Sequence, residues 1–199
     1  MSFRVEDKIP VTKYDRFILH KELKNKGMIK LFPDRHVSSV YFDNRELKIY
    51  QDSIEGLLPR KKFRIRNYNK INKYSFEKKI SSVEGRFKTS QKINKEEYDK
   101  LIKNGHLDSQ YGLVKPLITI SYTRMYFQYN KFRITIDSNI KFFQFSDIKK
   151  YFKSDKNVLE TKSPNLNDRD LIHSLIPFEK KRFSKYTEGI DSLNLFNFV

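Results

Sequence analysis

The sequence contains no cysteine and no tryptophan, and only six glycines and six prolines among its 199 residues. The absence of cysteine excludes disulfide bonds, thiolate metal sites and a cysteine nucleophile. The scarcity of glycine and proline favours tight turns and short connections. No stretch approaches the roughly 18 apolar residues of a membrane span, and the N-terminal stretch MSFRVEDKIPVTKYD lacks the apolar core of a secretion signal. We therefore expect a cytoplasmic protein without a membrane span.

Basic and aromatic residues are abundant instead. Lysine and arginine total 41 against 24 acidic residues, a formal net charge of +17, and the chain has 17 Phe and 12 Tyr. The aromatic content supplies a core, and the length suits one domain, which we expect to span residues 1–199. The charge predicts an anionic partner: nucleic acid, an anionic membrane or a polyanionic small molecule.

The residue pattern predicts a largely antiparallel β protein with interspersed helices. Thr12 and Asn94 have the spacing of helix N-caps, the latter with Glu97 three residues on. Strands are expected over 2–10, 28–32, 37–43, 60–68, 73–80, 85–93, 117–128, 131–138 and 156–162. Helices are expected over 12–25, 44–53, 94–104, 167–176 and from 184.

Several expected strands carry charged residues on one face and apolar residues on the other, because alternate residues of a strand share a face. Lys62, Arg64 and Arg66, for example, alternate with Phe63 and Ile65. Any single strand of this kind is explained by an ordinary solvent-exposed face. The same pattern recurs at 4–8, 74–80, 131–137 and 158–162. The repetition favours a barrel with polar inner walls and helices on its apolar outer surface.

Such a lumen suits polyphosphate chemistry. Arginine offers paired donors to phosphate oxygens, lysine offers a compact charge, and carboxylates among them suit Mg²⁺ or Mn²⁺. Arg124 does not fit simply, since it shares a face with the apolar Ile118 and Ile120. Its direction is therefore left open.

Ordered motifs along nearly the whole chain carry a family resemblance. They are FRVEDK (3–8), SVYFDN (39–44), RKKFRIRNY (60–68), FEKK (76–79), ISYTRMYF (120–127), FRITID (132–137), VLETK (158–162) and KRFSKYTEG (181–189). The sequence resembles the VTC-type polyphosphate polymerase domain of the triphosphate tunnel metalloenzyme (CYTH-like) superfamily.

The resemblance implies an α+β fold built on an eight-stranded antiparallel β-barrel tunnel with a basic lumen and surrounding helices. It implies substrate-binding roles for Lys8, Arg64, Arg66, Lys79, Lys88, Arg124, Lys162, Arg182 and Lys185. Of these, Arg64, Arg66, Lys79, Arg124 and Lys162 would act directly in catalysis. Glu160 falls on the family's metal-ligand glutamate. Glu6 and Glu77 share the faces of motif residues and are further candidates for metal binding or water positioning.

The resemblance implies a metal-dependent polyphosphate polymerase that transfers the terminal phosphate of ATP to a growing chain, with Mn²⁺ or Mg²⁺ as cofactor. Hydrolysis of triphosphate or nucleoside triphosphate, and polyphosphate binding without catalysis, stay open as alternatives. Nucleic acid is not expected as a partner, because Phe63 and Phe76 alternate out of phase with the basic residues. Membrane-complex relatives carry additional domains and transmembrane helices, so coupling to transport would need a membrane-protein partner. The oligomeric state is not indicated.

Overall fold

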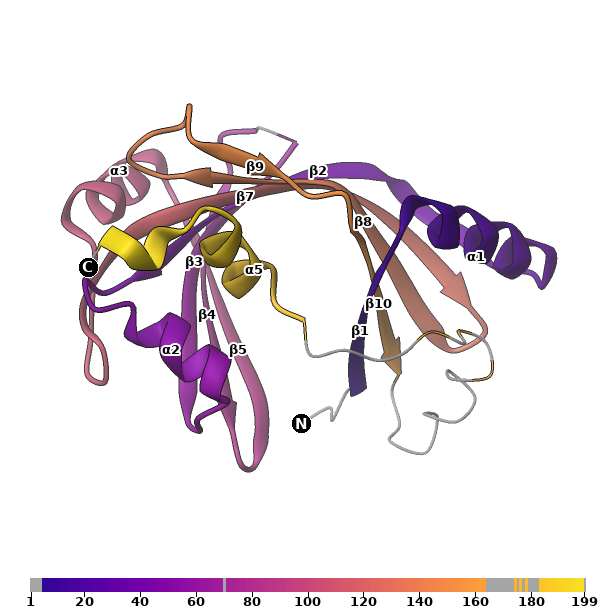
Figure 1. The fold of residues 1–199 in the computed structure, drawn as a ribbon, viewed down its shortest axis with the longest axis horizontal. Helices are drawn as coiled ribbons and strands as arrows, with labels where there is room; N and C mark the ends of the chain where they lie inside the picture. Colours follow the sequence, from indigo (N-terminus) through magenta and orange to yellow (C-terminus); the bar gives the residue numbers. More distant parts are fainter. Residues whose placement is uncertain are drawn as a thin grey trace. The chain divides into compact units, whose positions relative to one another are not determined.

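The computed structural model describes residues 5–69, 71–163, 174, 176, 178 and 183–198 (Figure 1). The strands are β1 (Val5–Val11), β2 (Ile29–Asp43), β3 (Arg60–Tyr68), β4 (Tyr74–Ser82), β5 (Gly85–Ile93), β6 (His106–Asp108), β7 (Gly112–Tyr129), β8 (Phe132–Gln144), β9 (Tyr151–Lys153) and β10 (Asn157–Ser163). The helices are α1 (Lys13–Asn25), α2 (Lys48–Glu55), α3 (Lys95–Asn104), α5 (Lys185–Ser192) and the 3₁₀ helix η2 (Leu195–Phe198). The helix expected over 167–176 lies outside the continuously described residues.

The predicted α+β class with antiparallel strand pairing is confirmed, but the predicted closed barrel of eight strands is wrong. The hydrogen-bonded order is β1-β10-β8-β7-β2-β3-β4-β5, with β6 on β7 and β9 on β8, which makes ten strands. Within the described residues no pairing joins β1 to β5, so the sheet does not close on itself. Eight strands do form the main path. Closure depends on the tilt and stagger of all strands together, which local patterns do not encode.

Most elements lie where the pattern predicts them. Thr12 and Asn94 each form a capping box, with Asp15 and Glu97 respectively. Asn130 adopts a positive φ of 50° between β7 and β8, as its place in a hairpin predicts. The expectation of strand over 28–32 and 37–43 is confirmed, but the two ranges belong to a single strand, because β2 runs through both without a break.

The chain divides into two compact units. Unit 1 comprises Met1–Arg35, Tyr122–Ile140 and Lys153–Phe183, and unit 2 comprises His36–Ser121, Lys141–Phe152 and Ser184–Val199. Our expectation of a single domain stays a prediction.

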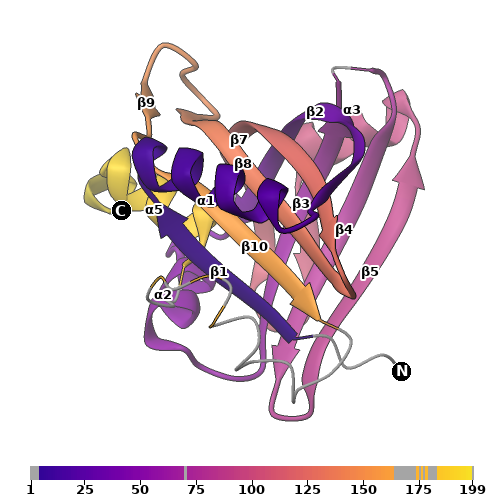
Figure 2. The same ribbon diagram turned by 90° about the vertical axis from the view of Figure 1, so that its right-hand side faces the viewer.

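The apolar faces of β1, β8 and β10 form the core of unit 1 with helix α1. Leu19 and Leu23 of α1 pack in one buried cluster with Ile9, Ile136 and Leu159. Figure 2 shows α1 lying over β10 and β8. Because alternate residues point to opposite faces, this packing turns the charged residues of the same strands away from α1.

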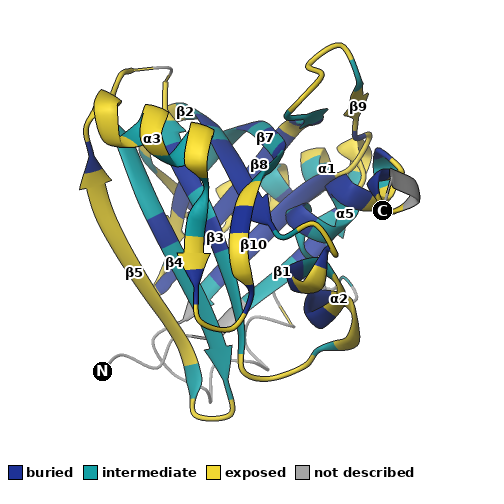
Figure 3. Cartoon of the chain, turned by 90° about the vertical axis from the view of Figure 1, so that its left-hand side faces the viewer, coloured by how far each residue is buried: buried dark blue, intermediate teal, exposed yellow. Residues whose placement is uncertain are grey.

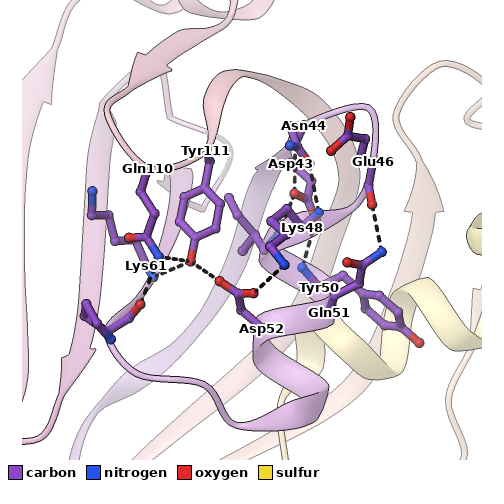
Figure 4. Close-up of polar contacts among 12 residues, drawn as sticks. Asp43, Asn44, Glu46, Lys48, Tyr50, Gln51, Asp52, Lys61, Gln110 and Tyr111 are labelled. Carbon is purple, nitrogen blue, oxygen red and sulfur yellow. Dashed lines mark hydrogen bonds and ion pairs between the residues drawn. The ribbon is translucent and has the colours of Figure 1, made fainter.

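In unit 2, buried carboxylates hold α2 beside its neighbours (Figure 4). The Asp43 carboxylate accepts hydrogen bonds of 3.0 Å from the backbone N–H groups of Ile49 and Tyr50, at the start of α2. The Asp52 carboxylate accepts one of 2.8 Å from the Tyr111 hydroxyl. These bonds satisfy helix donors that would otherwise lack partners, and they fix α2 at the end of β2.

Candidate functional site

Strands β3, β4 and β5 of unit 2 present cations in rows on one face. The antiparallel register places Lys62, Lys79 and Lys88 directly opposite one another across the three strands. The next row runs from Arg64 through Glu77. Further paired positions on the same face include Arg66, Ser75, Ser90 and Lys92. We call this surface the β3–β5 basic face.

The opposite face of the same strands is apolar, which explains the direction of the cations. Phe63 is fully buried and Ile65 is 2% exposed. The outermost strand, β5, is exposed along most of its length (Figure 3). The basic face is therefore a consequence of strict alternation in β3 and β4.

Glu77 is a buried carboxylate held by cations of the basic face. Its Oε2 atom accepts from Arg64 Nε at 2.6 Å, and its Oε1 atom accepts from Lys88 Nζ at 2.6 Å. Burial opposes ionisation, but the charges of Arg64, Arg66 and Lys88 outweigh it and lower the pKa of Glu77 to about 2. Glu77 is therefore ionised at neutral pH and orients Arg64.

Neighbouring side chains of β2 fix the two arginines further. Arg64 donates to the Tyr41 hydroxyl at 2.8 Å, and Arg66 donates to Ser39 Oγ at 3.1 Å. Burial raises the pKa of Tyr41, but the charges of Arg64, Arg66 and Lys185 lower it overall to about 8. Both guanidinium groups are thus preorganised, which reduces the entropy lost when an anion binds.

The start of α5 lies against the same region of unit 2. Ser184 Oγ accepts from Lys62 Nζ at 2.9 Å. The Tyr186 ring stacks on Tyr41 with centroids 5.3 Å apart, and its hydroxyl donates to the Asp43 carboxylate. Lys185 lies between Ser184 and Tyr186 in the sequence. The FSKY motif is therefore placed beside Tyr41 and Lys62.

A second charged cluster lies in unit 1, on the face of β1, β8 and β10 that points away from α1. Arg124 of β7 donates to both oxygens of Asp137, at 2.6 and 2.7 Å. Its guanidinium also lies 3.6 Å from Glu160 Oε2, and Lys162 Nζ lies 2.9 Å from Glu160 Oε1. Lys8 is the cross-strand partner of Glu160. We call this group the unit 1 charge cluster: Lys8, Arg124, Asp137, Glu160 and Lys162.

Electrostatics keep this cluster ionised. Burial disfavours the charged form of Glu160, but Arg124, Lys162 and Lys8 outweigh it and hold the pKa of Glu160 well below its usual range. Burial likewise opposes the charge of Arg124, and Tyr122, Asp137 and Glu160 together raise its pKa. The bidentate Arg124–Asp137 pair settles the direction of Arg124: it points into the charged face.

The structure thus brings most of the predicted residues into two groups. Arg64, Arg66, Lys79, Lys88 and Glu77 lie on the β3–β5 basic face, with Lys185 near Tyr41. Lys8, Arg124, Glu160 and Lys162 lie in the unit 1 charge cluster. Glu6 is the cross-strand partner of Lys162, and its side chain is not described. Arg182 lies outside the described residues. The roles given to these residues stay predictions.

Among the described residues, the carboxylates predicted to bind a metal occur singly and do not form a cluster. Within the described residues, no three His, Cys, Asp or Glu side chains come together as a metal-binding group. Glu160 and Glu77 belong to different units. Mg²⁺ is commonly held by one or two carboxylates together with substrate phosphates and water, and a ligating carboxylate must be ionised. Glu160, whose pKa is lowered, fits this donor set.

Sequence reasoning missed two residues that position the arginines. Asp137 is fully buried and pairs with Arg124, and Tyr41 accepts from Arg64. Both stand in the quoted motifs FRITID and SVYFDN, and both alternate correctly for the charged face. That alternation was the available signal. Alternation along a strand does not show which residue of the neighbouring strand a side chain pairs with.

A cavity of about 280 Å³ lies on the other side of unit 2's strands. Val40 and Ile65, a cross-strand pair of the apolar face, line it together with Tyr74 and Tyr98. It is thus separate from the β3–β5 basic face.

No helix within the described ranges is long and apolar enough to cross a membrane.

Comparison with solved structures gives the same fold at low sequence identity. A protein of Bacillus halodurans named as a candidate adenylate cyclase is 15% identical, with a TM-score of 0.66, covering 92% of this chain and 96% of that one. A Hippeastrum protein, named as a candidate adenylyl cyclase with a dominant triphosphatase activity, is 12% identical, with a TM-score of 0.63, covering 95% and 96%. A conserved protein of Pyrococcus furiosus is 13% identical, with a TM-score of 0.59, covering 93% and 99%.

No match was found among curated proteins. The model of the VTC domain family matches residues 3–194, which includes both charged groups and nearly the whole chain. The resemblance carried by the sequence motifs is thereby confirmed, and the chain belongs to the VTC domain family.

Proposed function

We propose that this protein is a metal-dependent phosphotransferase that transfers the terminal phosphate of ATP to a growing polyphosphate chain. The observation that carries the proposal is that cations surround a buried, ionised carboxylate in each charged group. Arg64 and Lys88 hold Glu77, and Arg124 and Lys162 hold Glu160. Cations fixed in this way are ready for phosphate oxygens before substrate arrives.

Phosphoryl transfer asks mainly for alignment and charge neutralisation. Arg64 and Arg66 would bind non-bridging phosphate oxygens, and their contacts to Glu77, Tyr41 and Ser39 would orient them. Lys79 and Lys88 would neutralise charge along the basic face. In unit 1, Lys8, Arg124 and Lys162 would bind phosphate in the same way. No side-chain nucleophile is required.

Glu160 would hold the divalent cation, Mn²⁺ or Mg²⁺, which supplies charge neutralisation at phosphate oxygens when bound. Its ionised state supports this role, because no proton has to leave before the cation binds. Arg124 and Lys162 would then transfer part of their interaction from the carboxylate to the substrate.

Membership of the VTC domain family supports transfer to polyphosphate over transfer to water. The Hippeastrum neighbour, at 12% identity, supports the fold alone. Incubation with ATP and Mn²⁺, with and without a short polyphosphate primer, separates the two reactions. ADP with lengthening chains supports the polymerase, ADP with free phosphate and no chains supports a hydrolase, and binding without turnover supports a binding module.

Adjacent lysines of β4 offer a matched pair of variants. Lys79 lies on the basic face, whereas Lys78 points to the other side and lies 3.6 Å from Asp108. We expect Lys79→Ala to lower turnover at least tenfold and Lys78→Ala to lower it less than about twofold. Equal effects of the two substitutions would show that net charge, and not the basic face, governs activity.

A further inference from the structure

Thr135 of β8 lies on the face of the unit 1 charge cluster and is the cross-strand partner of Glu160. It is 3% exposed. Its hydroxyl oxygen is buried and has no hydrogen-bond partner among the described residues. Buried hydroxyl groups normally have a partner, because leaving one unsatisfied costs stability. An unsatisfied hydroxyl beside a charged group calls for a ligand that would satisfy it.

Thr161 of β10 provides the comparison within the same sheet. It is 1% exposed, and its hydroxyl also has no partner within the described ranges. Thr161 is the cross-strand partner of Ile134, one position away from the Glu160–Thr135 pair, and so lies on the opposite face. That face packs against α1 through Leu159 and Ile134. The two threonines share residue type and burial but face different environments.

The surroundings of Thr135 indicate what it would bind. Lys8 is the cross-strand partner of Glu160, the Arg124 guanidinium lies 3.6 Å from Glu160 Oε2, and Lys162 Nζ lies 2.9 Å from Glu160 Oε1. The three cations of the cluster would attract an anionic ligand. A hydroxyl can donate one hydrogen bond to an anionic oxygen, whereas a valine of the same shape could not.

We propose that the Thr135 hydroxyl binds a phosphate oxygen of the triphosphate or polyphosphate substrate in the unit 1 charge cluster. The inference rests on the proposed function, because it takes its ligand from there. Lys162 has a side chain that is 34% exposed, so it can move from Glu160 toward the incoming phosphate. Thr135 then supplies a short, rigid donor between long cationic side chains, and fixes the rotation of the bound phosphate.

The test is calorimetric titration of the whole chain with tripolyphosphate in the presence of a chelator, so that no divalent cation takes part. The variants are Thr135→Val, Thr135→Ser and Thr161→Val. Loss of one hydrogen bond to a charged group is expected to weaken binding about ten- to hundredfold in Thr135→Val. Thr135→Ser keeps the hydroxyl and should stay within about threefold of wild type, and Thr161→Val should leave affinity unchanged.

Each outcome decides something. Unchanged affinity in Thr135→Val, with wild type binding normally, overturns the role of Thr135 and leaves the proposed function standing. Equal weakening in Thr161→Val overturns it too, because the effect would then come from packing in general. Absence of binding by the wild type overturns the proposed function together with the inference. If Thr135→Val does not fold, Thr135→Ser against Thr135→Ala makes the same comparison of hydroxyl and no hydroxyl.

Discussion

Glu77 offers a quantitative test of how the β3–β5 basic face is built. The substitution Glu77→Gln keeps the shape and removes the charge that holds Arg64 and Lys88. The pKa of this carboxyl falls from 4.5 to about 2 in the folded protein, and such a fall corresponds to about 3 kcal/mol of stabilisation above pH 5. The Lys88 side chain is 46% exposed, so solvent screens its part of the interaction with Glu77. We therefore expect Glu77→Gln to lower the free energy of unfolding by about 2 kcal/mol.

The sign of the pH dependence follows from the lowered pKa. A carboxyl whose pKa is lower in the folded state stabilises the protein above its unfolded value of 4.5, and this stabilisation is lost as pH falls toward about 2. Wild type should therefore exceed Glu77→Gln in unfolding free energy at neutral pH, and the gap should shrink by at least half near pH 3. Urea unfolding at several pH values measures it. A gap that is the same at all pH values would refute the electrostatic argument.

The same variant separates the two roles considered for Glu77. If Glu77 orients the cations, its loss leaves Arg64 and Lys88 without fixed positions, and tripolyphosphate should bind several-fold more weakly in a chelator. If it binds metal, the affinity for Mn²⁺ should fall instead. Glu84→Gln, on the exposed turn between β4 and β5, makes the same charge change as a control. Unchanged or tighter tripolyphosphate binding in the chelator would contradict the first role.

Three further predictions concern neighbouring contacts. Asp137→Asn should lower the free energy of unfolding by about 3 kcal/mol or more in denaturant titrations, because it leaves the charge of Arg124 without its bidentate partner. Tyr41, with a pKa of about 8, gains a negative charge as the pH rises. If phosphate binds at Arg64 and Arg66, the tripolyphosphate affinity of the wild type should therefore fall above about pH 8. In titrations of Tyr41→Phe this fall in affinity should be absent. Gly189→Ala would place a Cβ 2.8 Å from Phe142. Thermal unfolding should show that the free energy of unfolding falls by about 1–3 kcal/mol. An unchanged free energy of unfolding would contradict this packing.

Local alternation was sufficient to predict which side chains share a face. Lys62, Arg64 and Arg66 alternate with buried apolar residues, and the structure places them together. The N-caps at Thr12 and Asn94, the latter with Glu97 three residues on, were predicted for the same reason, and the structure shows a capping box at each. Signals of this kind lie within a few residues and need no tertiary information.

Arg124 shows where local pattern is insufficient. Ile118 and Ile120 lie on the same face of β7 and are fully buried, and Ile118 is close to Gly189 of α5. A strand from Gly112 to Tyr129 is long enough to begin under a helix and end in a charged cluster. The partner that decides the direction of Arg124 is Asp137, on the next strand. Strands β6 and β9, of three residues each, were missed because only their neighbours stabilise them.

The row of Lys62, Lys79 and Lys88 has a consequence for the folded state itself. Like charges at directly opposite positions of neighbouring strands repel each other. An anion that binds across the row relieves this repulsion in the folded chain and has no equivalent site in the unfolded one. The melting temperature should therefore rise with the concentration of the anion, by linkage of binding to folding. In a cell, the supply of such an anion would then affect how long this protein survives proteolysis.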